Sequence, residues 1–302
     1  MFLSWHAVKF QEHMKALNYS PRTIRDYGFQ LSYFMRYLES SNITEVGQIT
    51  RDVVRNYQMG LLTQEKQISL DTQRSRVVSL KSLFRYLFKT NQVMYDPTSD
   101  LEMPRRKKNL PRAIMTKKEI FTLLNQPDCD KPLGLRDKAI LELLYSTGIR
   151  NQEIRQLTVY DVNTVEHDLN IRQGKGQKDR VVPLGEIASN YIDEYLKHGR
   201  PKLLNGQETQ LLFITKNGLP INHANLIWLV RKYVKRAKID KNVTPHSVRH
   251  TFATHMLKNK APLPHIQQLL GHESIETTLI YTQVEVSDLK KAHKMYHPRE
   301  RG

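Results

Sequence analysis

Five sites between residues 150 and 281 carry side chains that could bind an anion, transfer a proton or act as a nucleophile. Arginines can hold the non-bridging oxygens of a phosphate and stabilise the charge that nucleophilic attack adds to them. A tyrosine can be the nucleophile, although its ordinary pKa of about 10 means that its surroundings must help to remove the proton. A lysine can supply the proton that the departing oxygen needs. The sites are Arg150, Lys175, the group His246, Arg249 and His250, then His272, and Tyr281.

Each site also has an ordinary structural interpretation. Arg150 could form a surface ion pair with Glu153, and a lysine between two glycines is usually just exposed. A single tyrosine such as Tyr281 more often packs than reacts. The histidines could cap helices, pack in a core or bind a metal. Since the sequence has no HExxH motif and no cysteine cluster, a zinc site is disfavoured.

The elements predicted around these sites place them at helix ends and at a hairpin tip. A helix predicted over Asp137–Ser146 has Gly148 as its C-terminal cap, two residues before Arg150. The stretch Leu169–Leu184 predicts a hairpin whose glycine-rich tip carries Lys175. Positions three and four residues apart share a helix face, so the histidine–arginine group lies on one surface. The other predicted elements are a short strand at Leu211–Phe213 and helices at about 222–237, 245–258, 264–270, 274–282 and 287–296.

The first 95 residues carry apolar side chains at helical spacing and no chemistry of their own. They predict four helices, over Ser4–Leu17, from Ser20-Pro21 onward, over about Thr50–Leu62 and from about Ser69 onward. Serine is a good N-cap and proline suits the first helical position, so Ser20-Pro21 marks a helix start. We interpret the apolar stripes as the core of a helical bundle.

The stretch from Tyr95 to Arg112 separates two predicted domains. It holds three prolines, which disfavour helix, and the basic run Arg105-Arg106-Lys107-Lys108. We therefore predict an N-terminal domain at 1–103, a basic linker at 104–112 and a C-terminal domain at 113–302. The basic run could be a solvated linker, but in this sequence we favour a strap that lies along DNA phosphates.

The charge of the chain predicts a polyanionic partner. The 302 residues hold 47 Lys and Arg against 30 Asp and Glu, a formal net charge of +17 with a pI near 9.8. The excess is +3 in residues 1–103 and +14 in residues 104–302. Nucleic acid is the simplest such partner, although a ribosome-associated protein or a merely solvated surface also fits. The single Cys129 excludes an internal disulfide, no apolar run could span a membrane and no signal peptide is evident, so we expect a cytoplasmic protein.

Five blocks of sequence follow one another along the second domain. They are Thr147-Gly148-Ile149-Arg150-Asn151-Gln152-Glu153, Gly174-Lys175-Gly176-Gln177-Lys178-Asp179-Arg180, Pro245-His246-Ser247-Val248-Arg249-His250, Leu269-Leu270-Gly271-His272 and Tyr281-Thr282. In type and order these blocks closely resemble the signature of the tyrosine recombinases, the phage integrase family. The length and the His297-Pro298-Arg299 ending are most similar to the Xer-type members.

The resemblance implies a role for each site and a fold to hold it. Arg150 and Arg249 would bind the phosphate, and Tyr281 would be the nucleophile. The other implied members are the hairpin lysine Lys175, His246 and His272 in the phosphate pocket, and Glu153 and His250 as supports. The implied fold is mostly α with a small β-sheet in the catalytic domain. A helical-bundle domain and a mixed α/β catalytic domain would form a C-shaped clamp on DNA.

The implied reaction is DNA strand exchange without ATP, metal or another cofactor. Attack by Tyr281 on a backbone phosphate would form a 3′-phosphotyrosine, and a 5′-hydroxyl from another strand would then reverse the step. Exchange between two duplexes needs four active sites, so the working unit would be a tetramer on double-stranded DNA with inverted-repeat arms, in the nucleoid. A second recombinase or an accessory protein could take part. DNA integration, excision and chromosome dimer resolution all stay open as roles.

Three other functions are weighed beside this one. A type IB topoisomerase-like enzyme would use the same chemistry to relax DNA. An architectural DNA-binding protein would need no catalysis, and the presence of all the catalytic residue types argues against it. A metal-dependent nuclease would need clustered carboxylates, which the sequence lacks.

The C-terminal tail predicts one more short helix. After Ser287, an apolar stripe is formed by Leu289, Ala292, Met295 and Tyr296. A helix this short is unstable alone and must bury its stripe. Packing on its own domain is the ordinary expectation, but the resemblance favours packing on a neighbouring protomer.

Overall fold

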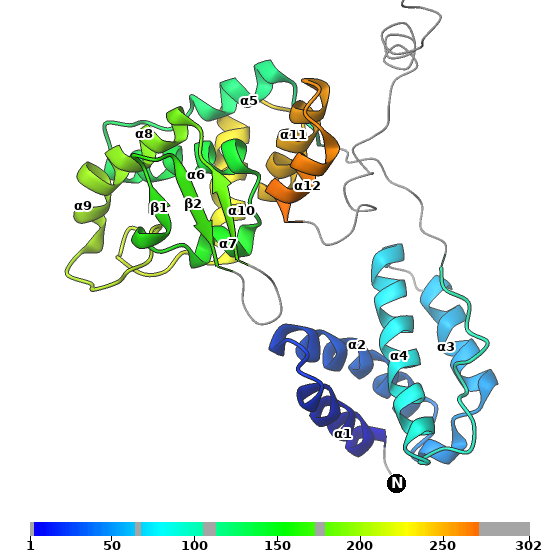
Figure 1. Ribbon diagram of the computed structural model, residues 1–302. Coiled ribbons are helices and arrows are strands. Elements are labelled where there is room, and N and C mark those ends of the chain that lie inside the picture. The colour runs from blue at the N-terminus through cyan, green and yellow to red at the C-terminus, as the bar shows by residue number, and fades with distance from the viewer. Residues whose placement is uncertain (1–2, 64–67, 105–112, 173–178, 272–302) are drawn as a thin grey trace, which may run out of the picture. The chain divides into compact units, whose positions relative to one another are not determined.

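The computed structural model describes residues 3–63, 68–104, 113–172 and 179–271. The chain divides into two compact units, Met1–Lys108 and Asn109–Gly302 (Figure 1). Most of the described residues are helical, and the strands form one small sheet. This composition confirms the predicted fold class. No helix among the described residues is long and apolar enough to cross a lipid bilayer.

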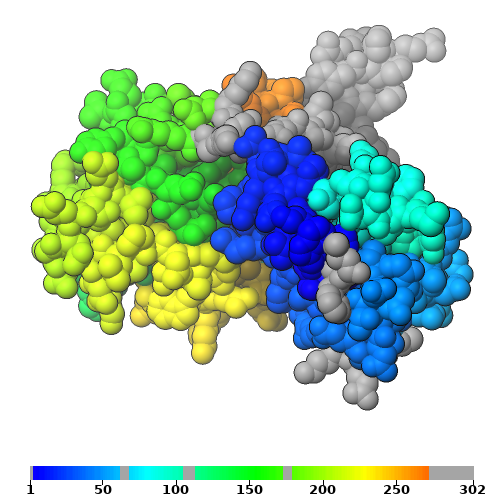
Figure 2. Space-filling view, turned by 90° about the horizontal axis from the view of Figure 1, so that it is seen from below, coloured from blue at the N-terminus to red at the C-terminus, as the bar shows by residue number. Residues whose placement is uncertain are grey.

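The first unit is a bundle of four helices, as predicted. They are α1 (Leu3–Ala16), α2 (Pro21–Ser40), α3 (Arg51–Thr63) and α4 (Leu70–Lys89), with a short 3-10 turn η1 (Val46–Gln48) before α3. Ser20 and Ser69 cap α2 and α4, since each side chain accepts a hydrogen bond from the backbone N–H three residues on. Phe34, Leu80 and Phe84 lie in the core with almost no exposed surface. In Figure 2 the blue surface of α1 and α2 meets the cyan surface of α4.

The second unit is built around one helix that is buried along most of its length. This helix is α6 (Pro132–Thr147), and its residues Ala139–Leu141 and Leu143–Leu144 have no exposed surface. In Figure 1 the sheet lies to one side of α6, and α11 and α12 lie to the other. The helices of this unit are α5 (Lys117–Leu124), α6, α7 (Asn151–Gln156), α8 (Glu186–Glu194), α9 (Arg200–Leu204), α10 (His223–Arg236), α11 (Pro245–Lys258) and α12 (Leu263–Leu270), with the short turns η2 (Val159–Asp161) and η3 (Tyr195–Gly199).

The sheet has three antiparallel strands in the order β1-β2-β3. The strands are β1 (Val162–Asn163), β2 (Asp168–Ile171) and β3 (Arg180–Pro183). Strands β2 and β3 confirm the predicted hairpin, and its tip at 173–178 lies outside the described residues. The register pairs Ile171 with Arg180, so Arg180 is the first residue of β3 after the tip.

The strand predicted at Leu211–Phe213 is wrong. Leu211 makes only an isolated bridge to Thr158 and joins no strand of the sheet. Leu212, Phe213 and Ile214 are all buried, with exposed fractions of 0%, 1% and 0%. A strand alternates its side chains between two faces. This run instead packs three successive apolar side chains into the core as irregular backbone.

Two glycines end the helices that lead into the predicted site. Gly148 follows α6 with a φ of 60°, and Gly271 follows α12 with a φ of 62°. This left-handed conformation is easy only for glycine. Both sites are tight as well, because a Cβ at position 148 would meet the ring of Phe252 and one at position 271 would meet the guanidinium of Arg180. The glycine predicted to cap the helix before Arg150 is therefore confirmed as its C-cap.

Candidate active site

The structure describes five of the residues singled out in the sequence and places them in one region of the second unit. Arg150 and Glu153 belong to the start of α7, and His246, Arg249 and His250 belong to α11. The other predicted members lie outside the described residues: Lys175, His272, Tyr281 and the basic run Arg105, Arg106, Lys107 and Lys108.

Arg150 is held by three hydrogen bonds at the N-terminus of α7. Its backbone N–H donates to Oε2 of Glu153 at 2.7 Å, and its guanidinium donates to Oε1 of the same carboxylate at 3.0 Å. A second guanidinium nitrogen donates to the backbone carbonyl of Gly271. The side chain keeps 34% of its surface exposed, so it is anchored and still accessible to a ligand.

Glu153 is a buried carboxylate shared by two arginines. It accepts the two bonds from Arg150 and two more from Arg180, at 2.9 Å to Oε1 and 3.1 Å to Oε2. Burial by itself raises the pKa of the Glu153 carboxyl. The hydrogen bonds from Arg180 and from the backbone of Arg150, with the charges of both arginines, outweigh burial and hold this pKa below its usual value. Glu153 is therefore ionised and can orient both guanidinium groups.

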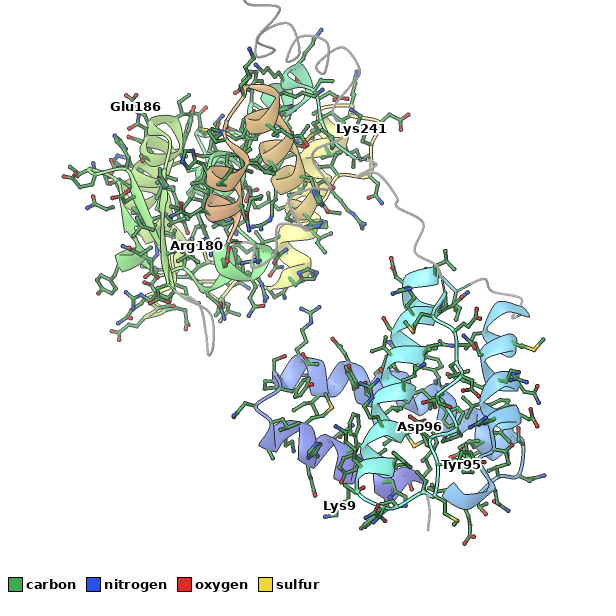
Figure 3. All side chains as sticks on the ribbon, turned by 45° about the vertical axis from the view of Figure 1, so that its right-hand side comes forward. Lys9, Tyr95, Asp96, Arg180, Glu186 and Lys241 are labelled. Carbon is green, nitrogen blue, oxygen red and sulfur yellow. The ribbon has the colours of Figure 1, made fainter. Side chains whose placement is uncertain are left out.

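Arg180 is the member of this network to which the sequence analysis gave no role. Figure 3 labels it beside the C-terminal end of α12, where its Nε donates to the carbonyl of Leu269 at 3.4 Å. The alternation of strand β3 contained a usable signal. Arg180 lies two residues before the fully buried Val182, so both side chains are on the inner face of the strand. An arginine on a buried face requires an acidic or carbonyl partner.

Arg249 links the ends of two helices from within the core. It is 3% exposed, and its guanidinium donates to the carbonyl of Gly148 at 2.7 Å and to the carbonyl of Leu270 at 2.8 Å. Gly148 ends α6, and Leu270 ends α12. Arg249 thus fixes the turn before Arg150 and the turn after α12 with one side chain.

Three arginines from three different elements meet at the C-terminus of α12. Arg180, Arg249 and Arg150 donate in turn to the successive carbonyls of Leu269, Leu270 and Gly271. The last carbonyls of a helix lack partners within it and form the negative end of its dipole, so they attract cations. Among the contacts that the structure describes, Glu153 is the one carboxylate bonded to these three guanidinium groups, which leaves an excess of two positive charges. Such a site favours an anion.

The histidines of α11 add a proton acceptor. The rings of His246 and His250 lie one helical turn apart with centroids 4.2 Å from each other. Burial lowers the pKa of His246, and the nearby charge of Arg249 lowers it further. His246 is therefore neutral near pH 7 and able to accept a proton.

His255, also on α11, has a purely structural environment. Tyr145 Oη lies 2.9 Å from its Nδ1, and its Nε2 lies 3.0 Å from the carbonyl of Met115. It is a satisfied core histidine. Among the residues that the structure describes, no group of three or more His, Cys, Asp and Glu side chains could hold a metal ion.

An apolar cavity of about 730 Å³ opens elsewhere on the same unit, among α5, α6, α8 and α11. Of the arginine and histidine residues described above, His255 alone lines it, and the members of the arginine site do not. Its lining includes Phe121, Tyr145, Ile187, Tyr191, Phe252 and Met256. The cavity is therefore separate from the anion site.

Comparison with known proteins covers both units. The family model described as "Phage integrase family" matches residues 113–287, and "Phage integrase, N-terminal SAM-like domain" matches residues 8–92. Tyrosine recombinase XerC 2 of Ralstonia nicotianae is 38% identical over 95% of this chain and 85% of its own length. Tyrosine recombinase XerD of Staphylococcus epidermidis is 36% identical over 93% of this chain and 94% of its own length.

A solved structure supports the fold. The crystal structure of XerH site-specific recombinase bound to palindromic difH substrate, a post-cleavage complex, superposes with a TM-score of 0.74 at 24% identity, over 96% of this chain and 84% of the other. At that identity the likeness speaks for the fold alone. Since the family model spans more than half of the chain and the two relatives align along nearly all of it, the chain belongs to the phage integrase family and is an Xer-like tyrosine recombinase.

Proposed function

We propose that the arginine site at the end of α12 holds the scissile phosphate of a DNA strand while Tyr281 attacks it. As a tyrosine recombinase, the chain is an enzyme of site-specific recombination. The observation that carries the proposal is the convergence of Arg150 and Arg249, from different elements, on adjacent carbonyls of one helix end. Two guanidinium groups fixed this close together suit the two non-bridging oxygens of one phosphodiester.

Each step then has a residue of this chain to perform it. Arg150 and Arg249 hold the phosphate and stabilise the charge that builds up during attack. The neutral His246 can accept a proton, and arginine charges at the bound phosphate would favour the phenolate form of an attacking tyrosine. His272 completes the phosphate pocket, and Glu153 and His250 support it. The roles of His272 and Tyr281 rest on their sequence motifs.

The bonds balance without an outside energy source. The bond from phosphorus to Tyr281 forms as the bond to the 5′-oxygen breaks, and Lys175 protonates that oxygen as it leaves. This step yields a 3′-phosphotyrosine and a free 5′-hydroxyl. A 5′-hydroxyl from a second strand then attacks the phosphotyrosine and releases Tyr281. One phosphodiester is exchanged for another, so the reaction consumes no ATP, and the arginines supply the charge stabilisation for which other enzymes of phosphoryl transfer use a metal ion.

The proposed partner is double-stranded DNA with inverted-repeat arms, bound by a tetramer of this chain. The net charge of +17 supports a polyanionic partner. Structural neighbours include the XerH recombinase bound to difH substrate and the Tn1549 transposon integrase in complex with circular intermediate DNA. We propose that the basic run Arg105–Lys108 contacts phosphates and that the protein associates with the nucleoid. The C-shaped clamp and the participation of a second recombinase or an accessory protein stay predictions, as does the choice among integration, excision and chromosome dimer resolution.

The test is covalent trapping on a nicked suicide duplex. The base sequence of this duplex is obtained by incubating the protein with fragments of genomic DNA and sequencing the fragments that it binds. After cleavage a short strand diffuses away from the nick, so the covalent intermediate accumulates and survives denaturation in SDS. We expect the adduct with the natural chain and none with Tyr281→Phe, which removes one oxygen and should leave folding and DNA affinity unchanged.

This assay, together with relaxation of a supercoiled plasmid, separates the competing functions. An adduct that persists in Tyr281→Phe would mean that another residue is the nucleophile. Cleavage that stops in EDTA would indicate a metal-dependent nuclease. Relaxation of a supercoiled plasmid without exchange between two sites would indicate a topoisomerase.

A further inference from the structure

Arg180 holds both of the groups to which Arg150 is bonded. Arg150 donates twice to Glu153 and once to the carbonyl of Gly271. Arg180 binds the same carboxylate through both of its terminal nitrogens, and its guanidinium packs against Gly271. A Cβ at position 271 would lie only 2.8 to 3.0 Å from three of the guanidinium atoms. Arg180 therefore binds one anchor of Arg150, Glu153, and packs against the other, Gly271.

The orientation of Arg150 depends directly on Arg180, because both side chains bind the Glu153 carboxylate. Each of its oxygens accepts one bond from Arg150 and one from Arg180. Glu153 is 8% exposed, so water cannot readily replace a donor that is lost. Without Arg180, the carboxylate would keep only its bonds to Arg150 and would be free to turn. Arg150 would then lose its fixed orientation.

Arg249 does not share this dependence. Its anchors are the carbonyls of Gly148 and Leu270, and neither of them accepts a bond from Arg180 among the described contacts. Among the described contacts, the direct route from Arg180 to the phosphate site therefore runs through Arg150.

We propose that Arg180 is a positioning residue for DNA cleavage, which orients the phosphate-binding guanidinium of Arg150 through Glu153 and through the C-terminal turn of α12. This inference rests on the proposed function, since it assumes that Arg150 binds the scissile phosphate. All three guanidinium nitrogens of Arg180 already donate to Glu153 or to the carbonyl of Leu269, so we assign it the orientation of Arg150 and no phosphate of its own (Figure 3).

The test is a double-mutant cycle between positions 180 and 150, read as the rate of covalent adduct formation on the suicide duplex. The variants are Arg180→Met, which keeps an unbranched apolar stem and removes the donors, Arg150→Lys, which weakens the phosphate contact, and the double variant. All rates are taken at saturating protein, and DNA affinity is measured separately. We expect Arg180→Met to slow cleavage by about 10- to 100-fold, as a shift of about 1 Å in a catalytic group can do, with unchanged DNA affinity.

Coupling is the decisive readout. We expect Arg180→Met to cause little further slowing in the Arg150→Lys background, because the orientation that Arg180 provides is already lost there. If it slows that background as much as it slows the natural chain, Arg180 does not act through Arg150 and the inference is overturned. A wild-type rate for Arg180→Met also overturns it. A wild-type rate for Arg150→Lys overturns the proposed function, and this inference with it.

Arg136 supplies a matched control. Like Arg180 it is 12% exposed, and it binds a neighbouring carboxylate, Asp137, and a backbone carbonyl, that of Ile214. Arg136→Met should lower the melting temperature. At saturating protein, its effect on the cleavage rate should be the same in the natural chain and in the Arg150→Lys background. If Arg180→Met does not fold, Arg180→Lys takes its place in the cycle. That variant keeps the charge but cannot bind both carboxylate oxygens in parallel, so we expect a smaller loss with the same coupling, and wild-type cleavage by it overturns the inference.

Discussion

Arg249 is almost completely buried, yet its guanidinium stays charged, because arginine does not lose its proton in a protein. The carbonyls of Gly148 and Leu270 compensate for the lost hydration by accepting its hydrogen bonds. Arg150, in contrast, is one third exposed and is anchored mainly by a carboxylate. The two arginines proposed to hold one phosphate thus differ in how much of the fold depends on them.

This difference predicts separate effects on rate and stability. Arg249→Ala and Arg150→Ala should each slow adduct formation by about 10²- to 10³-fold, as the loss of a preorganised donor to the transition state does. Arg249→Ala should also lower the free energy of unfolding by about 1–3 kcal/mol, because it leaves buried carbonyls without partners. We expect a clearly smaller loss of stability for Arg150→Ala. Cleavage rates and urea denaturation of both variants check this, and equal stability losses would contradict the structural role given to Arg249.

The last turn of α12 is the element that joins the parts of the site. Gly271 ends this helix in the left-handed region, and Arg180 packs against it. Gly271→Ala should therefore do two things: strain the backbone by about 1–2 kcal/mol and displace the guanidinium of Arg180. We expect lower stability together with slower cleavage at saturating DNA.

Gly206 provides the control at the element scale. It has a φ of 78°, but a Cβ there would meet nothing within 4 Å. Gly206→Ala should therefore show a similar fall in the midpoint of urea denaturation with normal cleavage. If Gly271→Ala cleaves as fast as Gly206→Ala, the close packing of Arg180 on this turn does not matter for catalysis.

Local sequence predicted most of the helices but not the contacts between them. The start of α2 at Pro21 and the end of α6 at Gly148 follow from caps that lie within a few residues of each helix end. The run at Leu211–Phe213 was misassigned because a short apolar segment does not reveal whether it alternates between two faces.

The part of the site that could not be predicted from the sequence depends on residues that are far apart along the chain. The residue types of Arg150, Arg249 and His246 suggested their chemistry, and the structure brings them into one region. The role of Arg180 was missed because its partners Glu153 and Leu269 lie 27 and 89 positions away in the sequence. No local pattern encodes an ion pair formed across that distance.

At the scale of the whole molecule, both units are basic. Residues 1–108 have a net charge of +7, and residues 109–302 have +10. The positive charge is therefore spread over both units, including the one that holds the arginine site. A field of this kind speeds the encounter with DNA, with an effect that weakens as salt rises. Sequence-specific binding by several copies must come from further contacts, because attraction to phosphates does not depend on sequence.

The C-terminal tail is our candidate for the contact between copies. Its predicted apolar stripe, Leu289 to Tyr296, needs a surface to cover, and three lysines lie on the same predicted helix. The apolar cavity among α5, α6, α8 and α11 offers a matching surface, with exposed apolar side chains at Phe121 and Ile187 and the acidic Glu186 in its lining. Docking of the tail on a neighbouring copy would couple the activity of each Tyr281 to the assembly of the protomers. Half of the active sites could then cleave while the other half are inactive.

Deletion of the chain from Val286 onward tests this arrangement. We expect the truncated protein to stay folded and bind a single site, yet to lose cooperative binding and the pairing of two sites in gel-shift assays. Ile187→Glu should cause the same loss in the full-length chain, and since Ile187 is 64% exposed, this charge should leave the melting temperature nearly unchanged. Unchanged cooperativity after the deletion would mean that the tail packs on its own domain, and unfolding would make the tail part of its own core. Loss of cooperativity in the truncated protein but not in Ile187→Glu would place the docking surface away from this cavity.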